Sequence, residues 1–172
     1  MYRTDRIYVT GNHELYAYLD GFAHKAKCLR NAALFRVRNT FTAHNKTALT
    51  ANEKEVKGEL ALLKGQKSYY VLGYGILQRL MRITYNPDFF SGLPMQTAQH
   101  VIRQVCTDFK GWLASLKKYR KDPSGYTGKP KMPGYCRNDT ASYLFTNQDA
   151  VIYDGKLKLP RTKIRIPVRR RH

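Results

Sequence analysis

The chain has 172 residues, with 31 lysines and arginines against 12 aspartates and glutamates, and its formal net charge is +19 at pH 7. Hydrophobic residues make up 42% of it, so it can bury a core, which argues against wholesale disorder, while the charge predicts a polyanionic partner such as nucleic acid. It has no run of about 18 apolar residues, no signal-peptide core and no cysteine pair at metal-ligand spacing, so we expect a cytoplasmic, nucleoid-associated protein with no membrane span and no structural zinc.

The sequence begins with a predicted strand and a predicted helix. Residues 3–10 alternate polar and apolar side chains, which is typical of a strand. Apolar residues at steps of three and four then predict an amphipathic helix over 13–39. Its buried face is expected to contain Leu15, Leu19, Phe22, Ala26, Leu29, Ala33 and Val37.

Two further helices are expected before residue 86. Thr50 and Glu53 have the spacing of a capping box, which predicts a helix over 51–64. The next apolar period predicts a helix over 67–84, and Pro87 follows its end.

The longest periodic pattern lies over 95–121. Its apolar stripe consists of Ala98, Val101, Ile102, Val105, Phe109, Trp112, Leu116 and Tyr119. The opposite strip consists of Gln96, Gln99, Arg103, Lys110 and Lys117. Such a strip of amides and cations can lie against a duplex, and an ordinary solvated face explains it equally well.

The last part of the chain predicts a basic loop followed by short strands. Glycine and proline punctuate the loop over 122–139, and Asp154-Gly155 is a strong hairpin signal. Strands are expected over 141–146, 150–153, 156–159 and 163–168. Because a lone first strand is not stable, we expect it to pair with these late strands, with the helices inserted between them.

Catalytic chemistry is not evident in the sequence, whereas binding chemistry is. A two-metal nuclease needs clustered carboxylates, and the few acidic residues here form no convincing triad. No phosphate-binding loop or dinucleotide fingerprint is present either. In contrast, 13 tyrosines are interleaved with cations, a combination that suits unpaired bases and phosphates, although about half of such rings serve as ordinary packing anchors.

Three segments resemble one known family. Residues 98–112, the loop Gly128-Lys129-Pro130-Lys131 and above all the run YLFTNQDAVIYDGKLKLP over 143–160 are similar to the N-terminal half of TnpB proteins. These are transposon-encoded, RNA-guided nucleases related to type V CRISPR effectors. A weaker similarity covers Arg30-Asn31-Ala32-Ala33-Leu34, and the strong part of the resemblance spans about 95–160.

The resemblance implies an α+β fold, in which a small β-barrel, the wedge domain, carries a mostly helical recognition domain inserted after its first strand. Residues 1–11 would then form the first wedge strand and 12–121 the recognition domain. Residues 122–139 would form the basic loop and 140–172 the later wedge strands, with the barrel incomplete in this chain.

The resemblance also implies the partners, namely a guide RNA and a target DNA duplex whose flanking motif is read by protein side chains. The residues at the matching positions are Gln99, its neighbour Gln96, Thr146 and Asn147. Contacts to phosphate are expected from Arg30, Arg36, Arg103, Lys110, Lys117, Lys118, Lys129, Lys131, Arg137, Lys163 and Arg165.

The sequence departs from the family at Met132-Pro133 and over 51–60, and it reaches His172 before the family's nuclease carboxylates and zinc-binding cysteines. We therefore expect no catalytic residue and no cofactor here, with Mg²⁺ and Zn²⁺ belonging to a nuclease half on a separate chain or further along the same one. Two alternatives remain. The first is a stand-alone, cleavage-dead TnpB-like repressor or accessory subunit, and the second is a general basic RNA-binding protein.

Overall fold

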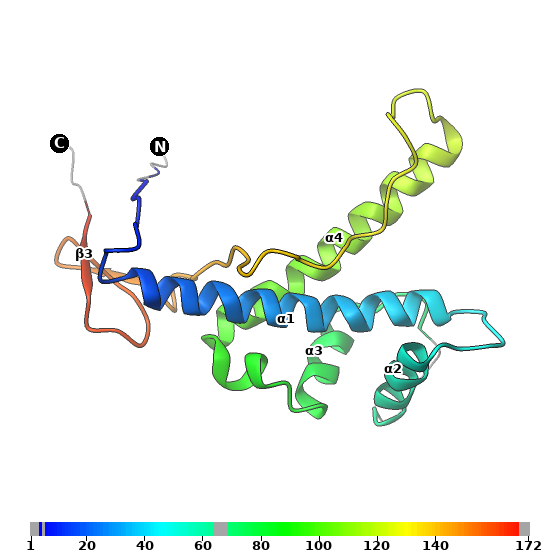
Figure 1. The fold of residues 1–172 in the computed structure, drawn as a ribbon, viewed down its shortest axis with the longest axis horizontal. Coiled ribbons are helices and arrows are strands. Elements are labelled where there is room, and N and C mark those ends of the chain that lie inside the picture. Colours follow the sequence, from blue (N-terminus) through cyan, green and yellow to red (C-terminus); the bar gives the residue numbers. More distant parts are fainter. Residues whose placement is uncertain (1–3, 5, 64–68, 169–172) are drawn as a thin grey trace.

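The computed structural model describes residues 4, 6–63 and 69–168, and it is mainly helical (Figure 1). Its helical elements are α1 (Tyr16–Ala43), α2 (Ala51–Ala61), α3 (Tyr74–Ile83), the π-helical turn η1 (Asp88–Gly92) and α4 (Met95–Lys121). Its strands are β1 (Val151–Tyr153), β2 (Lys156–Lys158) and β3 (Arg165–Pro167). None of the helices in the described ranges has both the length and the apolar character needed to cross a membrane.

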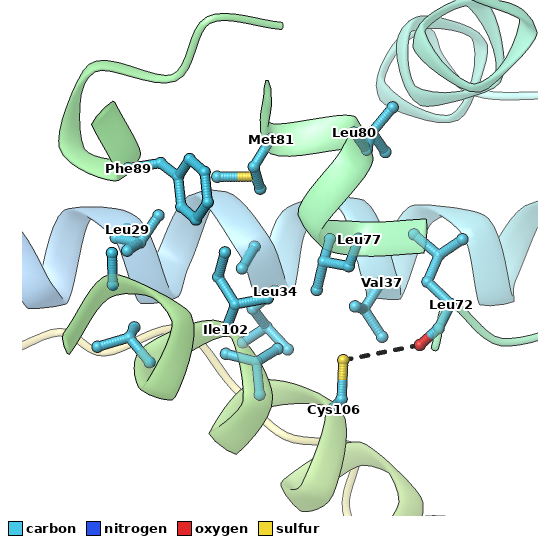
Figure 2. Packing of buried hydrophobic residues seen from close by; sticks show 14 of the residues in the cluster. Leu29, Leu34, Val37, Leu72, Leu77, Leu80, Met81, Phe89, Ile102 and Cys106 are labelled. Carbon is cyan, nitrogen blue, oxygen red and sulfur yellow. Dashed lines mark hydrogen bonds between the residues drawn. The ribbon is translucent and has the colours of Figure 1, made fainter. Parts of the chain in front are cut away.

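The core forms where α1 packs against the other helices. Helix α1 contacts α2, α3, α4 and η1, and the predicted apolar face is buried except for Leu19, which is half-buried. Figure 2 shows the centre of this core, where Leu34 of α1, Leu77 of α3, Phe89 of η1 and Ile102 of α4 converge. All four side chains are buried, so the helices are held together mainly by the removal of apolar surface from water.

Helix α4 has the bounds that the sequence predicts, 95–121. Its apolar stripe is buried from Ala98 to Phe109. On the same helix, the Cys106 thiol donates to the Leu72 carbonyl at 3.8 Å (Figure 2). Burial raises the pKa of that thiol, although the charge of Lys110 opposes the shift. Toward the end of the helix Leu116 is still buried, whereas Trp112 and Tyr119 are half-buried.

The two shorter helices differ in how well the sequence predicted them. The capping box of α2 is confirmed, because the Thr50 hydroxyl accepts from the Glu53 amide and the Glu53 carboxylate accepts from the Thr50 amide. The helix expected over 67–84 begins only at Tyr74, since Gly73 before it is extended. Residues 67 and 68 lie outside the described part of the chain.

The predicted β-barrel is wrong. The three strands form an open antiparallel sheet of order β1-β2-β3, with three residues in each strand, and most of their side chains are exposed. Such short strands cannot enclose a barrel interior. The expected first strand is also absent from its described residues, 4 and 6–10, which form no ladder with the late strands.

The segment expected as a strand over 141–146 is extended but joins no ladder, because its side chains pack on α1 instead. Tyr143 and Phe145 lie edge-on to the Phe22 ring, with centroids 6.2 and 5.7 Å away. The Tyr143 hydroxyl donates to the Leu19 carbonyl at 3.1 Å, and burial raises the pKa of Tyr143 to about 12. The predicted hairpin is confirmed, with Asp154 and Gly155 at φ of 48° and 66° between β1 and β2.

Candidate nucleic-acid interface

The most prominent feature outside the core is an arm formed by residues 110–131, which we call the cationic arm. Figure 1 shows the second half of α4 projecting beyond the helical body and the following loop turning back along it. The arm carries one acidic residue, Asp122, and seven basic ones. The seven are Lys110, Lys117, Lys118, Arg120, Lys121, Lys129 and Lys131.

The arm has its own internal contacts, which hold its loop against the end of α4. The indole N–H of Trp112 donates to the Pro130 carbonyl at 3.1 Å, and the rings of Tyr119 and Tyr126 meet edge to face with centroids 5.7 Å apart. At the turn, the Asp122 carboxylate accepts from the Ser124 amide at 3.0 Å and from its hydroxyl at 2.6 Å. These bonds lower the pKa of Asp122, so the single acid of the arm is engaged within its own turn.

The returning chain is then fixed to α1. The Asn31 side chain donates to the Cys136 carbonyl at 3.0 Å and accepts from the Cys136 amide at 2.8 Å. Two turns further along α1, the Arg38 guanidinium donates to the Pro133 carbonyl at 2.8 Å and lies 5.2 Å from the centre of the Tyr135 ring. Two residues of α1 therefore hold the base of the arm against the body.

All seven cations of the arm are exposed. Within the described part of the chain, none of them forms an ion pair, whereas the ion pairs that are present join Arg30 to Asp108, Arg36 to Glu59 and Lys46 to Glu53. The arm therefore has a high density of uncompensated positive charge, which attracts phosphate without reading sequence.

Four polar residues were predicted to read bases, and they lie at the opposite end of α4. Gln96 and Gln99 are half-buried in its first turns, and Asn147 is exposed in the loop before β1. The buried Thr97 links the two segments, because its hydroxyl lies 3.0 Å from the Leu144 carbonyl and 3.1 Å from the Asp149 carboxylate. The loop with Asn147 is thus held beside the start of α4, and none of the predicted readers is in the core.

The hydroxyl of Thr146 is already engaged in that loop. It donates to the same Asp149 oxygen at 3.3 Å and accepts from the Gln148 amide at 3.3 Å. The side chain of Thr146 therefore shapes the loop, whereas the amide of Asn147 is the exposed polar group next to it.

Two predicted phosphate ligands lie inside the helical body. The Arg36 guanidinium is largely buried and donates to Glu59 at 2.6 Å, to Thr84 at 3.3 Å and to the Ala32 carbonyl at 3.0 Å. Arg30 pairs with Asp108 at 2.9 Å and is half-buried. We leave both out of the interface because each guanidinium is already paired with a carboxylate of the fold.

The other predicted phosphate ligands are at the surface. Arg103 is exposed, with its guanidinium 4.8 Å from the centre of the Tyr74 ring, and Arg137 is exposed just beyond the base of the arm. Lys163 and Arg165 line an open cavity of about 870 Å³ beside the sheet. The same cavity is lined by Arg161, and also by Lys156 and Lys158, the two residues that the sequence reasoning missed.

Arg120 and Lys121 were not among the predicted phosphate ligands, although both continue the run of cations that starts at Lys117. The sequence contains a pattern that could have identified them, because cations at a helix end followed by a basic loop are expected to lie on one surface. The role of Asn31 in holding the arm carries no such signal, since its partner is a backbone group 105 residues away.

Among the described residues, no group of three or more histidines, cysteines, aspartates or glutamates is placed to hold a metal ion. Comparison of the chain with protein-family models, curated proteins and solved structures finds no match.

Proposed function

We propose that this chain binds nucleic acid through the cationic arm, with a duplex lying along the exposed side of α4. The observation that supports this is the set of seven exposed cations in the arm that form no ion pair with the described residues. The alternative of a merely basic surface predicts charges spread among acids, but the arm contains only Asp122, which is engaged with Ser124.

Three exposed cations lie in a row along α4. Arg103, Lys110 and Lys117 recur every seven residues on one side of the helix. Seven residues of helix rise about 10.5 Å, so the row extends over about 21 Å and is long enough to contact several phosphates of one duplex.

Our proposal for the biological role follows the resemblance to TnpB proteins. In it, the chain holds a guide RNA and a target DNA as the non-catalytic part of an RNA-guided endonuclease, and Gln96, Gln99 and Asn147 read the flanking motif. The proposal is supported by the position of Asn147, which Thr97 and Asp149 hold beside the first turns of α4. Uncharged amides at the surface can recognise base edges, whereas the cations supply affinity.

A salt titration tests the arm. The affinity for a DNA duplex of about 20 base pairs, measured by fluorescence anisotropy across a range of KCl concentrations, should fall with a log–log slope of up to about −6 if all seven arm cations contact phosphate. Lys117→Ala combined with Lys118→Ala should reduce that slope by about two.

The matched control removes two exposed lysines of α2, by Lys54→Ala combined with Lys57→Ala. This variant has the same net charge as the arm variant but an intact arm. If the two variants lose equal affinity and equal slope, binding follows total charge, and the arm is not the interface.

A second experiment tests the reading of the flanking motif. Duplexes with a randomised flank are selected by the protein together with its co-purifying RNA, and the retained sequences are compared between wild type, Gln99→Ala and Asn147→Ala. We expect both substitutions to change the preferred flank, and Lys117→Ala to weaken binding without changing it. Identical preferences in all four proteins would contradict the assignment of Gln99 and Asn147 as readers, whereas the absence of any preference would favour the general RNA-binding alternative.

A further inference from the structure

We infer that the chain has a second nucleic-acid site, which stacks an unpaired base of a single-stranded segment on Tyr85 and holds the adjacent phosphates with Arg79 and Arg82. The inference rests on the proposed nucleic-acid binding and extends it, since it assigns a single-stranded ligand to a surface other than the arm. In Figure 1, α3 and η1, which form most of this site, lie on the other side of α1 from the tip of the arm.

The site is a groove between the end of α2, the end of α3 and η1. It has a volume of about 520 Å³, which is within the roughly 300–1,000 Å³ of small-molecule sites. Its lining includes Leu62, Ile83, Tyr85 and Phe90, all of which are exposed, together with Arg79 and Arg82. Exposed apolar groups that are gathered at one place usually mark a binding surface.

The backbone holds two aromatic rings outward at this groove. Tyr85 has φ of 49°, a left-handed conformation that is costly for a residue with a side chain, and 81% of its surface is exposed. In the π-helical turn η1, Phe89 points into the core while Phe90 remains 45% exposed. The rings of Tyr85 and Phe90 are nearly parallel, at 28°, with centroids 6.2 Å apart.

The charges around the groove identify the occupant. Arg79 and Arg82 are three residues apart on α3, so they lie on one face of the helix, and both are exposed. Neither forms an ion pair with the described residues, and the lining contains no carboxylate. Aromatic faces beside two unpaired guanidinium groups suit a ligand that alternates planar rings with phosphates, which is a single-stranded nucleic acid.

The test compares a single-stranded oligouridine of ten nucleotides with an abasic oligonucleotide of the same length. One stacked base should give wild type a roughly five- to 150-fold preference for the oligouridine. Tyr85→Gly should remove most of this preference, and glycine suits the left-handed φ, so the fold should be retained. Arg82→Ala should weaken binding to both oligonucleotides, because it removes a phosphate contact.

Three variants serve as controls. Tyr8→Ala removes a tyrosine that is equally exposed, at 80%, and should leave the preference unchanged. Tyr85→Leu keeps apolar area without a π face, and it should behave like Tyr85→Gly. Lys117→Ala combined with Lys118→Ala should weaken duplex binding and leave the ratio between the two oligonucleotides as it is, which separates this inference from the arm proposal.

The inference is overturned if Tyr85→Gly or Tyr85→Leu retains the preference of wild type for the oligouridine. It is also overturned if wild type binds the two oligonucleotides equally while an acidic, apolar peptide binds in a Tyr85-dependent manner. That second result would assign the groove to a protein partner.

Discussion

The bonds of Thr97 give the sharpest test of how the loop with Asn147 is positioned. Thr97 has no exposed surface, and its hydroxyl lies 3.0 Å from the Leu144 carbonyl and 3.1 Å from an Asp149 carboxylate oxygen. A hydroxyl carries one proton, so it serves one of these acceptors at a time. Thr97→Val keeps the branched shape and removes that proton, which should cost about 1–3 kcal/mol of unfolding free energy.

Thr97→Val should change both the stability of the whole fold and the local stability of the loop with Asn147. Urea denaturation should show the loss of unfolding free energy, and amide hydrogen exchange should become faster over 144–150 because the loop loses its tie to α4. The preference for a flanking motif should also weaken, although the Thr97 side chain itself is buried.

Two substitutions control for the change of side chain. Thr97→Ser keeps the hydroxyl and should retain the loop contacts. Thr107→Val removes a hydroxyl from the same helix that donates to the Arg103 carbonyl at 3.1 Å at the surface, and it should change stability by less than about 0.5 kcal/mol. If Thr97→Val is as mild as Thr107→Val, and exchange over 144–150 is unaltered, the reasoning about the loop is refuted.

Three further predictions follow from other contacts. Asn31→Ala removes both bonds to Cys136, so amide exchange at the base of the arm should accelerate while the helical core stays protected. Arg36→Ala leaves the Glu59 charge largely buried without a partner and should lower the unfolding free energy by about 3–5 kcal/mol. Arg36→Met combined with Glu59→Leu should leave the unfolding free energy, measured by urea denaturation, nearly unchanged. Equal losses in the two variants would mean that the ion pair is not desolvated. Hydrogen bonds from Lys46 and from the Thr50 amide lower the pKa of Glu53 from 4.5 to about 2. The ionised carboxylate therefore contributes to the unfolding free energy above about pH 4.5, and this contribution is lost as the pH falls toward 2. Glu53→Gln should flatten the pH dependence of the unfolding free energy measured in urea over this range, and an unchanged pH profile would contradict the assignment.

The sequence predicted the helical part of the fold well because its signals are local. The stripe of α4 and the Thr50–Glu53 capping box each depend on residues within a few turns, and so does the Asp154-Gly155 hairpin. The prediction of a barrel was wrong because strand pairing depends on partners that are far apart in the sequence. The side chains of Tyr143 and Phe145 alternate as in a strand, but they pack against Phe22 of α1 instead of joining a ladder.

In the candidate site, too, features with local sequence signals could be predicted and those that depend on distant partners could not. The cations of the arm could be recognised from their density in the sequence, and all of them are exposed. The internal role of Arg36 could not, because its partner Glu59 lies 23 residues away on another helix. A cation on a predicted helix gives no sign of whether it faces solvent or a carboxylate until the packing of that helix is known.

Helix stability alone accounts for only part of the charge on the arm. Lys118, Arg120 and Lys121 lie in the last turn of α4, where the helix dipole favours cations by about 0.3–1 kcal/mol each. The dipole does not explain Lys129 and Lys131, which lie beyond the helix, or Lys110 and Lys117, which precede its last turn.

The surplus charge has a cost in the isolated chain. Lys117 and Lys121 are four residues apart, and a like-charged pair at that spacing is unfavourable by about 0.2–0.5 kcal/mol. Glutamates between them would relieve the repulsion, yet the single acid of α4, Asp108, is paired with Arg30. The arm is therefore more strongly charged than its own stability requires, and a polyanion alongside it turns that repulsion into attraction.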